Sequence, residues 1–337
     1  MLLVVRHTEN GRQNITWIDK DHTSLSVHTG VNGLGRTPVS HLMLRQVFHR
    51  MLADIRQDLA LTGVPSLQLS QFEQLKDSST STHAGEGLGY FNQVWSVEEF
   101  ARKHSDATFR QTFLEKACRI LRLCACLIHI SGGPSPRGTE EAVTRLLNSQ
   151  TEQQRNVVFI DGTIGVQGGY VSLLWYVTSR MFINAVIRYM KQRKYTSGIG
   201  VLVKFLPFEF AVVLANIILM VKPVEAEFAS LLHQTCPEQT KAFLFTEYGS
   251  PVNPDTMSAK LSASFKEYGL DINMADLRHA MDAFAHKLGR PCAVWDPILV
   301  SLANHQPSTS ARYGRDEHNV IDVPADICEE NGIRLVV

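Results

Sequence analysis

Three short segments, far apart in the chain, carry residue types that suit chemistry at a phosphate group. They are "GGPSPRGTEE" around Arg137, "ADLRHAMDAFAHKLG" around Arg278, and "ANHQPSTSARYGRD", which holds His305 and Tyr313. The planar guanidinium group of an arginine binds two phosphate oxygens at once and stays charged at any physiological pH. A tyrosine hydroxyl, with an ordinary pKa of about 10, becomes a useful nucleophile only where positive charges stabilise its phenolate. The combination indicates a phosphate site that needs no metal ion.

Each of these residues also has an ordinary structural explanation. Arg137 can pair with either of the two glutamates that follow it at the start of a helix. Arg278 lies on an amphipathic helical pattern, where an arginine more often faces solvent. His305 can cap a helix end, and Tyr313 can be a half-buried packing residue. The three segments therefore point to chemistry only when they are taken together.

Length and composition predict an ordinary globular protein of two domains. The chain has 337 residues, which exceeds the usual length of a single domain. Apolar residues make up 44% of it and charged residues 20%, which excludes wholesale disorder. The formal net charge is zero, so the overall charge gives no sign of nucleic-acid binding.

The distribution of charge along the chain is more informative than its sum. The stretch from Gly162 to Phe208 contains no acidic residue. It carries six basic residues, Arg180, Arg188, Lys191, Arg193, Lys194 and Lys204. Such a segment suits contacts to phosphate groups, and it also suits a solvated face balanced by acidic residues elsewhere.

Cysteine usage and hydropathy favour an intracellular protein without a membrane span. The six cysteines form no CxxC or metal-ligand spacing, and we expect reduced thiols; they are Cys118, Cys124, Cys126, Cys236, Cys292 and Cys328. The most apolar run, "FLPFEFAVVLANIILMV", is interrupted by Pro207, Glu209 and Asn216. It falls short of a membrane-spanning length and predicts a buried helix.

The first third of the chain predicts helices on either side of a linker. Residues 1–35 show no clear periodicity and are expected to be an irregular lead-in. Apolar residues at helical spacing, from Leu44 to Leu59, predict a helix within residues 36–61. Small and polar residues at 75–92 indicate a loop or linker. Ser96 is expected to cap a short helix, and residues 107–130 to form a long one.

The rest of the chain predicts helices around a small sheet. A helix is expected from Thr139 to about Leu147, followed by strands at 155–167, 185–191 and 199–207. Further helices are expected at 207–221, 254–268, 274–288 and 293–303. The predicted fold class is mainly α with a small inserted β-sheet (α+β). The predicted domains are a helical domain at 36–100 and a second domain at 101–337, with a boundary between 95 and 107.

In their order and in the residues around them, the three segments resemble the tyrosine recombinase (phage-integrase-like) family. The words "GGPSPRGTEE" and "RYGRD" are most similar to Crypton-type and related fungal recombinase-like proteins. The resemblance covers residues 36–316. It implies a tyrosine recombinase catalytic fold at 101–337 preceded by a DNA-clamping core-binding domain. It also implies a mobile-element-derived enzyme that cuts and rejoins DNA through a 3′-phosphotyrosine intermediate.

The resemblance assigns a role to each candidate residue. Tyr313 would be the nucleophile, Arg137 and Arg278 would clamp the phosphate, and His305 would donate a further hydrogen bond. Lys191, in "RYMKQRK", would be the general acid, with Lys194 and Lys204 as rivals. The residues expected to contact DNA are Arg188, Arg193, Lys194 and Lys204. The implied partners are double-stranded DNA and three further copies in a homotetramer, with no cofactor or metal, inside the cell and in the nucleus of a eukaryote.

Two departures from the family pattern support alternative hypotheses. Ala275 stands where the family has a histidine, so His279 or His286 would have to replace it, or catalysis is impaired. The 54 positions from Arg137 to Lys191 exceed the family's usual gap. One alternative is therefore a domesticated DNA-binding protein of the same fold. A remote alternative is a histidine-phosphatase-like enzyme, because "RHTEN" resembles that family's motif at His7.

Overall fold

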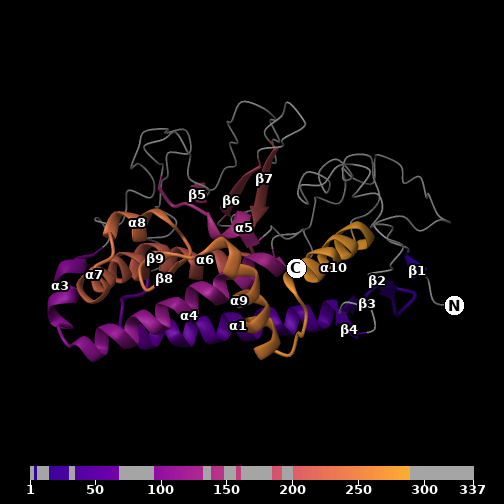
Figure 1. Ribbon diagram of the computed structural model, residues 1–337, viewed down its shortest axis with the longest axis horizontal. Helices are drawn as coiled ribbons and strands as arrows, with labels where there is room; N and C mark the ends of the chain where they lie inside the picture. The colour runs from indigo at the N-terminus through magenta and orange to yellow at the C-terminus, as the bar shows by residue number, and fades with distance from the viewer. Residues whose placement is uncertain are drawn as a thin grey trace.

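The computed structural model describes residues 4–5, 15–29, 35–67, 95–131, 138–147, 157–160, 184–191 and 200–288. These residues are mostly helical and include small antiparallel sheets, which confirms the predicted class of mainly α with small β elements. Helices α1 (His41–Thr62) and α4 (Ala107–Ser131) pack side by side along one side of the molecule. The strands β5 to β7 lie on the opposite side (Figure 1).

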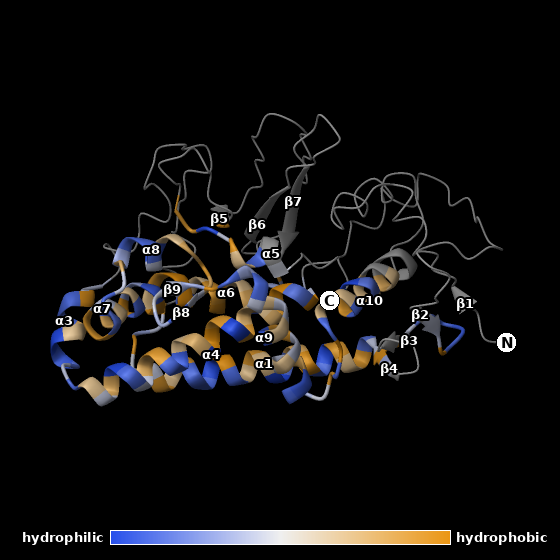
Figure 2. Cartoon of the chain, viewed as in Figure 1, coloured by the Kyte–Doolittle hydropathy of each residue, from blue (hydrophilic) through white to orange (hydrophobic). Residues whose placement is uncertain are grey.

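The two long helices form where the apolar periodicity predicts them. Ser40 caps α1 by accepting a hydrogen bond from the Met43 amide, and Gly63 ends it with a φ of 72°. Both helices are amphipathic over part of their length, with hydrophobic and hydrophilic residues alternating along them (Figure 2). The C-terminal part of α4, from Leu123 to Ser131, is buried throughout. Such a segment stands in the centre of a core.

Polar contacts fix how α1 sits against its neighbours. Arg119 of α4 forms ion pairs with Asp54, at 2.9 Å, and with Asp58, both in α1. The Tyr268 hydroxyl donates to Asp54 at 2.5 Å, which ties the end of helix α9 (Pro254–Glu267) to the same place. Burial, with the Asp54 carboxylate, raises the pKa of Tyr268, so the hydroxyl keeps its proton and remains a donor.

A short helix, α3 (Val97–Lys103), begins at Ser96 as predicted, with the Ser96 hydroxyl accepting from the Glu99 amide. Its Phe100 ring stacks on Phe228 of helix α7 (Lys222–His233), with ring centroids 6.3 Å apart. Arg110 lies over the same Phe228 ring at 5.5 Å. These contacts pack α3 and the start of α4 against α7.

The helix expected at 207–221 continues well beyond its predicted end. Helix α6 (Phe208–Asn216) runs through a π-helical turn, η1 (Ile217–Val221), directly into α7. Pro223 explains both the error and the π turn, because a proline inside a helix lacks an amide donor and crowds the carbonyl four residues before it. The wider turn, in which the Lys222 amide bonds to the Ile217 carbonyl, accommodates the proline without ending the helix.

The π turn places Lys222 in the interior, where it belongs to a closed polar triangle. Its Nζ donates to Glu225 at 2.7 Å and to the Thr246 hydroxyl at 2.6 Å. The Thr246 hydroxyl in turn donates to Glu225 at 2.6 Å. Both charged side chains are fully buried. Burial lowers the pKa of Lys222, and the adjacent Glu225 opposes that shift.

Residues 1–35, expected to be irregular, contain strands of a four-stranded antiparallel sheet. Its order is β1 (Val4–Val5), β2 (Ile15–Trp17), β3 (Ser24–Thr29) and β4 (Gly35–Ser40). Strand β3 pairs Leu25 with Val39 and Val27 with Thr37. Leu25, Val27 and Val39 are fully buried, whereas the serines between them are not. The period-two pattern was present in "SLSVHT" but is short and rich in polar residues.

A second antiparallel sheet confirms the strands predicted in the basic stretch. It consists of β5 (Val157–Ile160), β6 (Asn184–Lys191) and β7 (Gly200–Phe205), with β6 in the centre. Helix α5 (Gly138–Ala142) precedes it and is shorter than the predicted helix to Leu147. It ends early because the Leu146 amide bonds to the Ala242 carbonyl and the Leu244 amide to the Thr144 carbonyl, which draws the chain into an extended path.

The C-terminal part of the described chain is a hairpin followed by two helices. Helix α8 (Pro237–Ala242) leads into β8 (Thr246–Glu247) and β9 (Ser250–Pro251), which turn at Tyr248 and Gly249. Helices α9 and α10 (Met274–Leu288) occupy the predicted positions. The helix predicted at 293–303 and the linker predicted at 75–92 lie outside the described residues.

One hydrophobic core spans the described chain, from Trp17 in β2 to Phe284 in α10. It includes residues on both sides of the boundary predicted near residue 100, such as Met51 and Leu127. The predicted domain limits therefore remain a sequence-based prediction. Within the described ranges, none of the helices has the length and apolar content needed to cross a lipid bilayer.

The buried triangle gives a prediction for stability. Lys222→Met should lower the free energy of unfolding by about 3–5 kcal/mol, because it leaves the Glu225 carboxylate buried without its partner. The double variant Lys222→Met/Glu225→Leu should lose much less than the two single variants added together. Urea unfolding measures all three, with Lys266→Met, an exposed lysine, as the control. A Lys222→Met protein as stable as the control would contradict the arrangement.

Candidate functional site

The structure describes part of the predicted site. Arg278 is described with its side chain, and the backbones of Lys191, Arg188 and Lys204 are placed in β6 and β7. The remaining predicted positions lie outside the described residues: Arg137, Arg193, Lys194, His305, Tyr313 and, for the alternative hypothesis, His7. The described residues include the elements that surround Arg278, the helix that follows Arg137 and the strand that ends at Lys191.

Arg278 is buried, with 9% of its surface exposed, on the core side of α10. Asn273, the residue before this helix, caps it, because its side chain accepts a hydrogen bond from the Asp276 amide at 2.9 Å. Leu277, Ala280 and Phe284, on the same helix, are also buried. The ordinary explanation of Arg278 as a solvent-facing residue is therefore wrong. Removing a guanidinium group from water costs free energy, so Arg278 is not one of the charged residues on the solvent-exposed face of the helix.

Helix α9 is the element against which the predicted site elements pack. Helix α5 begins at Gly138, the residue after Arg137, and packs against both α9 and β6. Helix α10 also packs against α9 (Figure 1). The elements that carry Gly138 (the residue after Arg137), Lys191 and Arg278 are far apart in the sequence. In the fold they are linked by their contacts with α9 and α5.

The approach of α5 to α9 requires a glycine at position 138. A Cβ atom added to Gly138 would lie 2.3 Å from the Ser258 hydroxyl oxygen and 3.3 Å from the Ser258 amide nitrogen. The first distance is far below van der Waals contact. The sequence "PRGTE" therefore contains a residue whose lack of a side chain sets how closely the helix after Arg137 can pack.

A buried contact joins the two ends of the glycine- and proline-rich segment. The His129 Nδ1 atom, in α4, lies 3.3 Å from an Oε atom of Glu141, in α5. Both side chains are almost completely buried, and the His129 ring also lies near Phe265 of α9. Sequence reasoning missed this pair, because a histidine in an apolar helix and a glutamate at a helix start each have ordinary explanations. Their separation of twelve residues gives no periodic signal.

Position 275, where the tyrosine recombinase pattern has a histidine, is exposed. Ala275 lies one helical turn before Arg278 and faces solvent, whereas the adjacent His279 is partly buried. The methyl group at 275 therefore contributes nothing to the core. The described residues include His279 as a neighbouring imidazole.

The register of the sheet places the basic strand residues relative to each other. Lys191, the last residue of β6, pairs with Gly200, and Arg188 pairs with Val203. Lys204 of β7 pairs with Ile187. Because residues alternate between the two faces of a strand, positions 191 and 204 belong to one face of the ladder and position 188 to the other. The predicted DNA contacts are thus divided between both faces.

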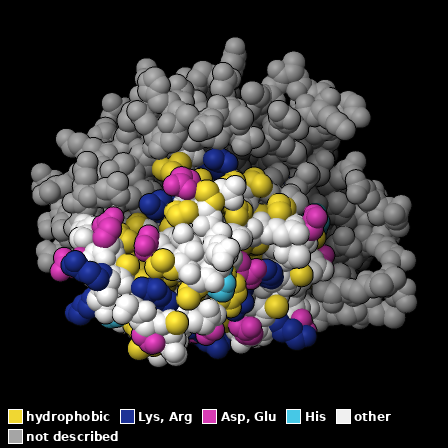
Figure 3. Space-filling view, turned by 60° about the vertical axis from the view of Figure 1, so that its left-hand side comes forward, with side chains coloured by type: hydrophobic (Ala, Val, Ile, Leu, Met, Phe, Trp, Pro, Cys, Tyr) yellow, Lys and Arg dark blue, Asp and Glu magenta, His cyan; other side chains and the backbone are white. Residues whose placement is uncertain are grey.

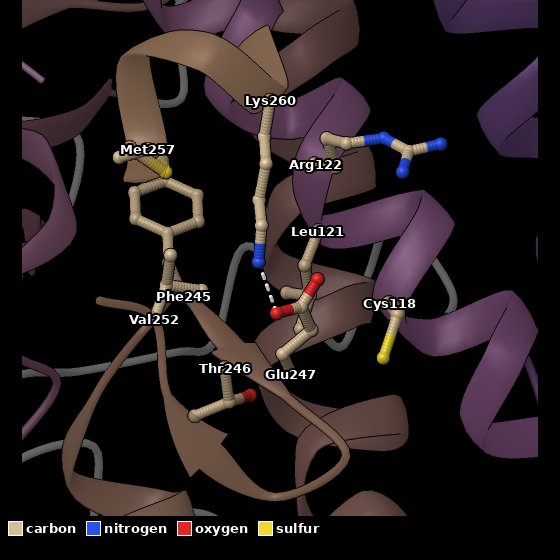
Figure 4. Close-up of a pocket in the computed structure, with 9 residues that line it drawn as sticks. All are labelled: Cys118, Leu121, Arg122, Phe245, Thr246, Glu247, Val252, Met257 and Lys260. Atoms are coloured by element: carbon tan, nitrogen blue, oxygen red, sulfur yellow. Dashed lines mark hydrogen bonds and ion pairs between the residues drawn. The ribbon is translucent and has the colours of Figure 1, made fainter. Parts of the chain in front are cut away.

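A small pocket lies elsewhere, between α4, β8 and α9 (Figure 4). Its volume is about 20 Å³, which is room for a single water molecule. Lys260 reaches down to form an ion pair with Glu247, whereas Arg122 points away from that pair (Figure 4). None of the predicted site residues lines this pocket, and its size excludes it as a substrate site.

Cys118, at the edge of this pocket, is a poor nucleophile. Its sulfur accepts a hydrogen bond from the Tyr248 amide at 3.2 Å. Burial raises the pKa of the Cys118 thiol to about 11. Cys118, Cys124, Cys126 and Cys236 are all free thiols, and the described residues contain no cluster of His, Cys, Asp or Glu side chains that could hold a metal ion.

No family model, no curated protein and no solved structure matches the chain. The resemblance to tyrosine recombinases rests on the short motifs around Arg137, Arg278 and Tyr313. The packing of α5 and α10 against α9 adds a spatial observation about the elements that hold two of these motifs.

The contact at Gly138 gives a prediction. Gly138→Ala should destabilise the protein by about 1–3 kcal/mol, because its new methyl group overlaps the Ser258 hydroxyl. Ser258→Ala should be close to neutral alone and should recover part of that loss in the double variant. Thermal unfolding of the three variants measures the coupling. Strictly additive losses would show that the two helices do not meet at this point.

The thiols give a prediction for chemical reactivity. At pH 8 Cys118 should be alkylated by iodoacetamide far more slowly than exposed Cys236, because about a thousandth of a thiol with a pKa near 11 is thiolate. Mass spectrometry of peptides after timed quenching gives both rates in one sample. Raising the pH to 10 should increase the Cys118 rate by about 100-fold, in proportion to its thiolate. Equal rates for the two cysteines at pH 8 would be inconsistent with a half-buried Cys118 whose pKa is raised.

Proposed function

We propose that the chain is a DNA strand-breaking and rejoining enzyme of the tyrosine recombinase type. The observation that carries this proposal is the convergence on α9 of the helix that starts beside Arg137 and the helix that bears buried Arg278. The strand that ends at Lys191 packs against the first of these helices. A recombinase needs these three residues around one phosphate, and the packing of their elements is compatible with that need.

The proposed reaction balances without a metal ion or an energy source. The Tyr313 hydroxyl oxygen attacks the scissile phosphorus and loses its proton to water, and the bond from phosphorus to the 5′ oxygen breaks. Lys191 gives a proton to the departing 5′ oxygen. The resulting 3′-phosphotyrosine conserves the ester, so a 5′ hydroxyl can attack it and rejoin a strand. Arg137, Arg278 and His305 stabilise the negative charge on the nonbridging oxygens.

The burial of Arg278 supports its proposed role as a phosphate clamp. A guanidinium group in a site of low dielectric attracts a phosphate more strongly than it would in water. It also needs little reorganisation when charge develops in the transition state.

The distribution of charge suggests which side faces DNA. On the face shown in Figure 3, basic and acidic side chains of the described residues are interspersed. The acid-free stretch, in contrast, forms β6 and β7, on the side of α5 away from α1. We infer that double-stranded DNA lies along the face of β6 and β7 that carries Lys191 and Lys204, with Arg193 and Lys194 as further contacts, whereas Arg188, on the opposite face of the ladder, would lie away from that duplex. A homotetramer around two duplexes, in the nucleus of a eukaryote, follows from the same proposal.

One observation favours a second candidate function. Ala275 is exposed on the first turn of α10, where a recombinase would present an imidazole. The second candidate is therefore a DNA-binding protein of the same fold whose catalysis is impaired. The two candidates share the phosphate site and differ in whether it forms a covalent bond.

The first candidate predicts a covalent protein–DNA adduct. Incubation with a library of nicked suicide duplexes should trap a 3′-phosphotyrosine, detected as a shifted band and by peptide mass. Tyr313→Phe should abolish it, because no nucleophile remains. Arg278→Ala should slow its formation on the order of 100- to 1,000-fold, as expected for loss of one charge-stabilising group. The exposed Arg102→Ala is the matched control and should form the adduct at the wild-type rate.

Two outcomes separate the candidates. Retained DNA binding with no adduct from any duplex would favour the impaired DNA-binding protein. An adduct that survives Tyr313→Phe would refute the assignment of the nucleophile. If the wild-type protein neither binds DNA nor forms an adduct, both candidate functions are refuted.

A further inference from the structure

The N-terminal sheet is packed directly onto the helix that carries Arg278. The Trp17 ring of β2 meets the Phe284 ring of α10 edge to face, with ring centroids 5.7 Å apart and planes at 70°. The His41 ring, at the start of α1, also packs against the Phe284 ring, and the two ring centroids lie 4.4 Å apart. Trp17 and Phe284 are each 2% exposed, so these two rings are closed to solvent, and His41 is half-buried beside them.

A second contact joins the sheet to the residues just before α10. The Thr37 hydroxyl, in β4, donates to the Asp271 carbonyl at 3.0 Å. Two residues later Asn273 caps α10, and its amide group also donates to the Asp276 carboxylate at 2.5 Å. The sheet therefore contacts α10 at two places. Thr37 bonds just before the start of the helix, and Trp17 packs against Phe284 further along it.

Arg278 lies between these two points of attachment. It follows the capping residue Asn273 by little more than one turn and precedes Phe284 by six residues. A helix of this length is stiff, so fixing its beginning and its middle fixes the backbone at residue 278 as well. The aromatic contacts also fix the rotation of α10 about its own axis, because edge-to-face rings prefer a narrow range of angles.

His41 takes part in this cluster as a neutral aromatic ring. Burial lowers the pKa of His41 below its ordinary value, so the imidazole is uncharged at neutral pH. A neutral ring packs against Phe284 without the cost of burying a charge. Its backbone amide also donates to the Thr23 carbonyl, which joins the start of α1 to the sheet.

We propose that the N-terminal sheet, through Trp17 and Thr37, together with His41 at the start of α1, is the positioning element that holds Arg278 where the phosphate is to bind. The inference rests on the proposed function and extends it, because it assigns a role in the site to residues 15–41. These residues do not touch the substrate. They act through α10, and displacement of a clamping arginine by about 1 Å is enough to cost on the order of 100-fold in rate.

Trp17→Leu in the full-length protein is the test. Hydrogen exchange of the backbone amides in α10 should become roughly tenfold faster, whereas exchange in α4 should stay unchanged. The rate of adduct formation on the nicked duplex should fall by roughly 100-fold, with DNA affinity within about twofold of wild type. Trp17→Phe, which keeps an aromatic ring, should restore most of both properties.

The matched control is Phe113→Leu, which shortens an equally buried aromatic residue in α4. Phe113 packs against Phe228, a residue of α7 and not of α10, with ring centroids 5.1 Å apart. It should lower the melting temperature to a similar extent while leaving exchange in α10 and the adduct rate unchanged. Equal effects of Trp17→Leu and Phe113→Leu on α10 would overturn the inference.

A double variant shows whether Trp17 acts through Arg278. In an Arg278→Ala background, Trp17→Leu should cause no further loss of adduct rate, because the positioned group is already absent. A full additional loss would mean that Trp17 acts by another route and would refute the proposal. If the wild-type protein forms no adduct, the proposed function fails, and exchange in α10 still decides whether the sheet holds that helix.

Discussion

The burial of the C-terminal half of α4 is the constraint on which the other elements depend. From Leu123 to Ser131 every side chain of this helix is enclosed, and α1, α7, α9 and β8 all contact α4. Enclosing an apolar helix on every side removes a large area from water, which is the main favourable term in folding. The glycines and prolines before Arg137 follow the end of α4 in the sequence.

Buried polar contacts then select one arrangement of these helices. The Lys222 triangle joins α7 to β8, His129 and Glu141 join α4 to α5, and Arg119 joins α4 to α1. Apolar packing tolerates small rotations and slips of one helix over another, whereas hydrogen bonds between enclosed groups do not. Such pairs contribute little net stability, because burying their charges costs nearly as much as the attraction returns. Their contribution here is to fix the register of helices that would otherwise slide.

The sequence predicted elements with strong local signals and missed features that depend on distant partners. Helices α1, α9 and α10 follow from apolar spacing, and α3 from the serine that caps it. The N-terminal strands were missed because Ser24 and Ser26 mask the alternation of Leu25 and Val27. The burial of Arg278 and the pairing of His129 with Glu141 were missed because neither residue type reveals its tertiary contacts. For the candidate site, the motifs identified the candidate residues. The exposure of each side chain and the residues that surround it could not be predicted from the motifs.

The π turn between Ile217 and Val221 has a consequence for the phase of the helix that contains it. Each residue of an α-helix advances the chain by about 100° around the axis, whereas a π turn takes up about one residue more per turn. If the same sequence ran through this turn as a regular α-helix, everything after it would be rotated by about 100°. Glu225 and Phe228 would then point to different neighbours, away from Thr246 and Phe100. The irregular turn is thus the angular adjustment that lets one continuous helix match two differently oriented surfaces.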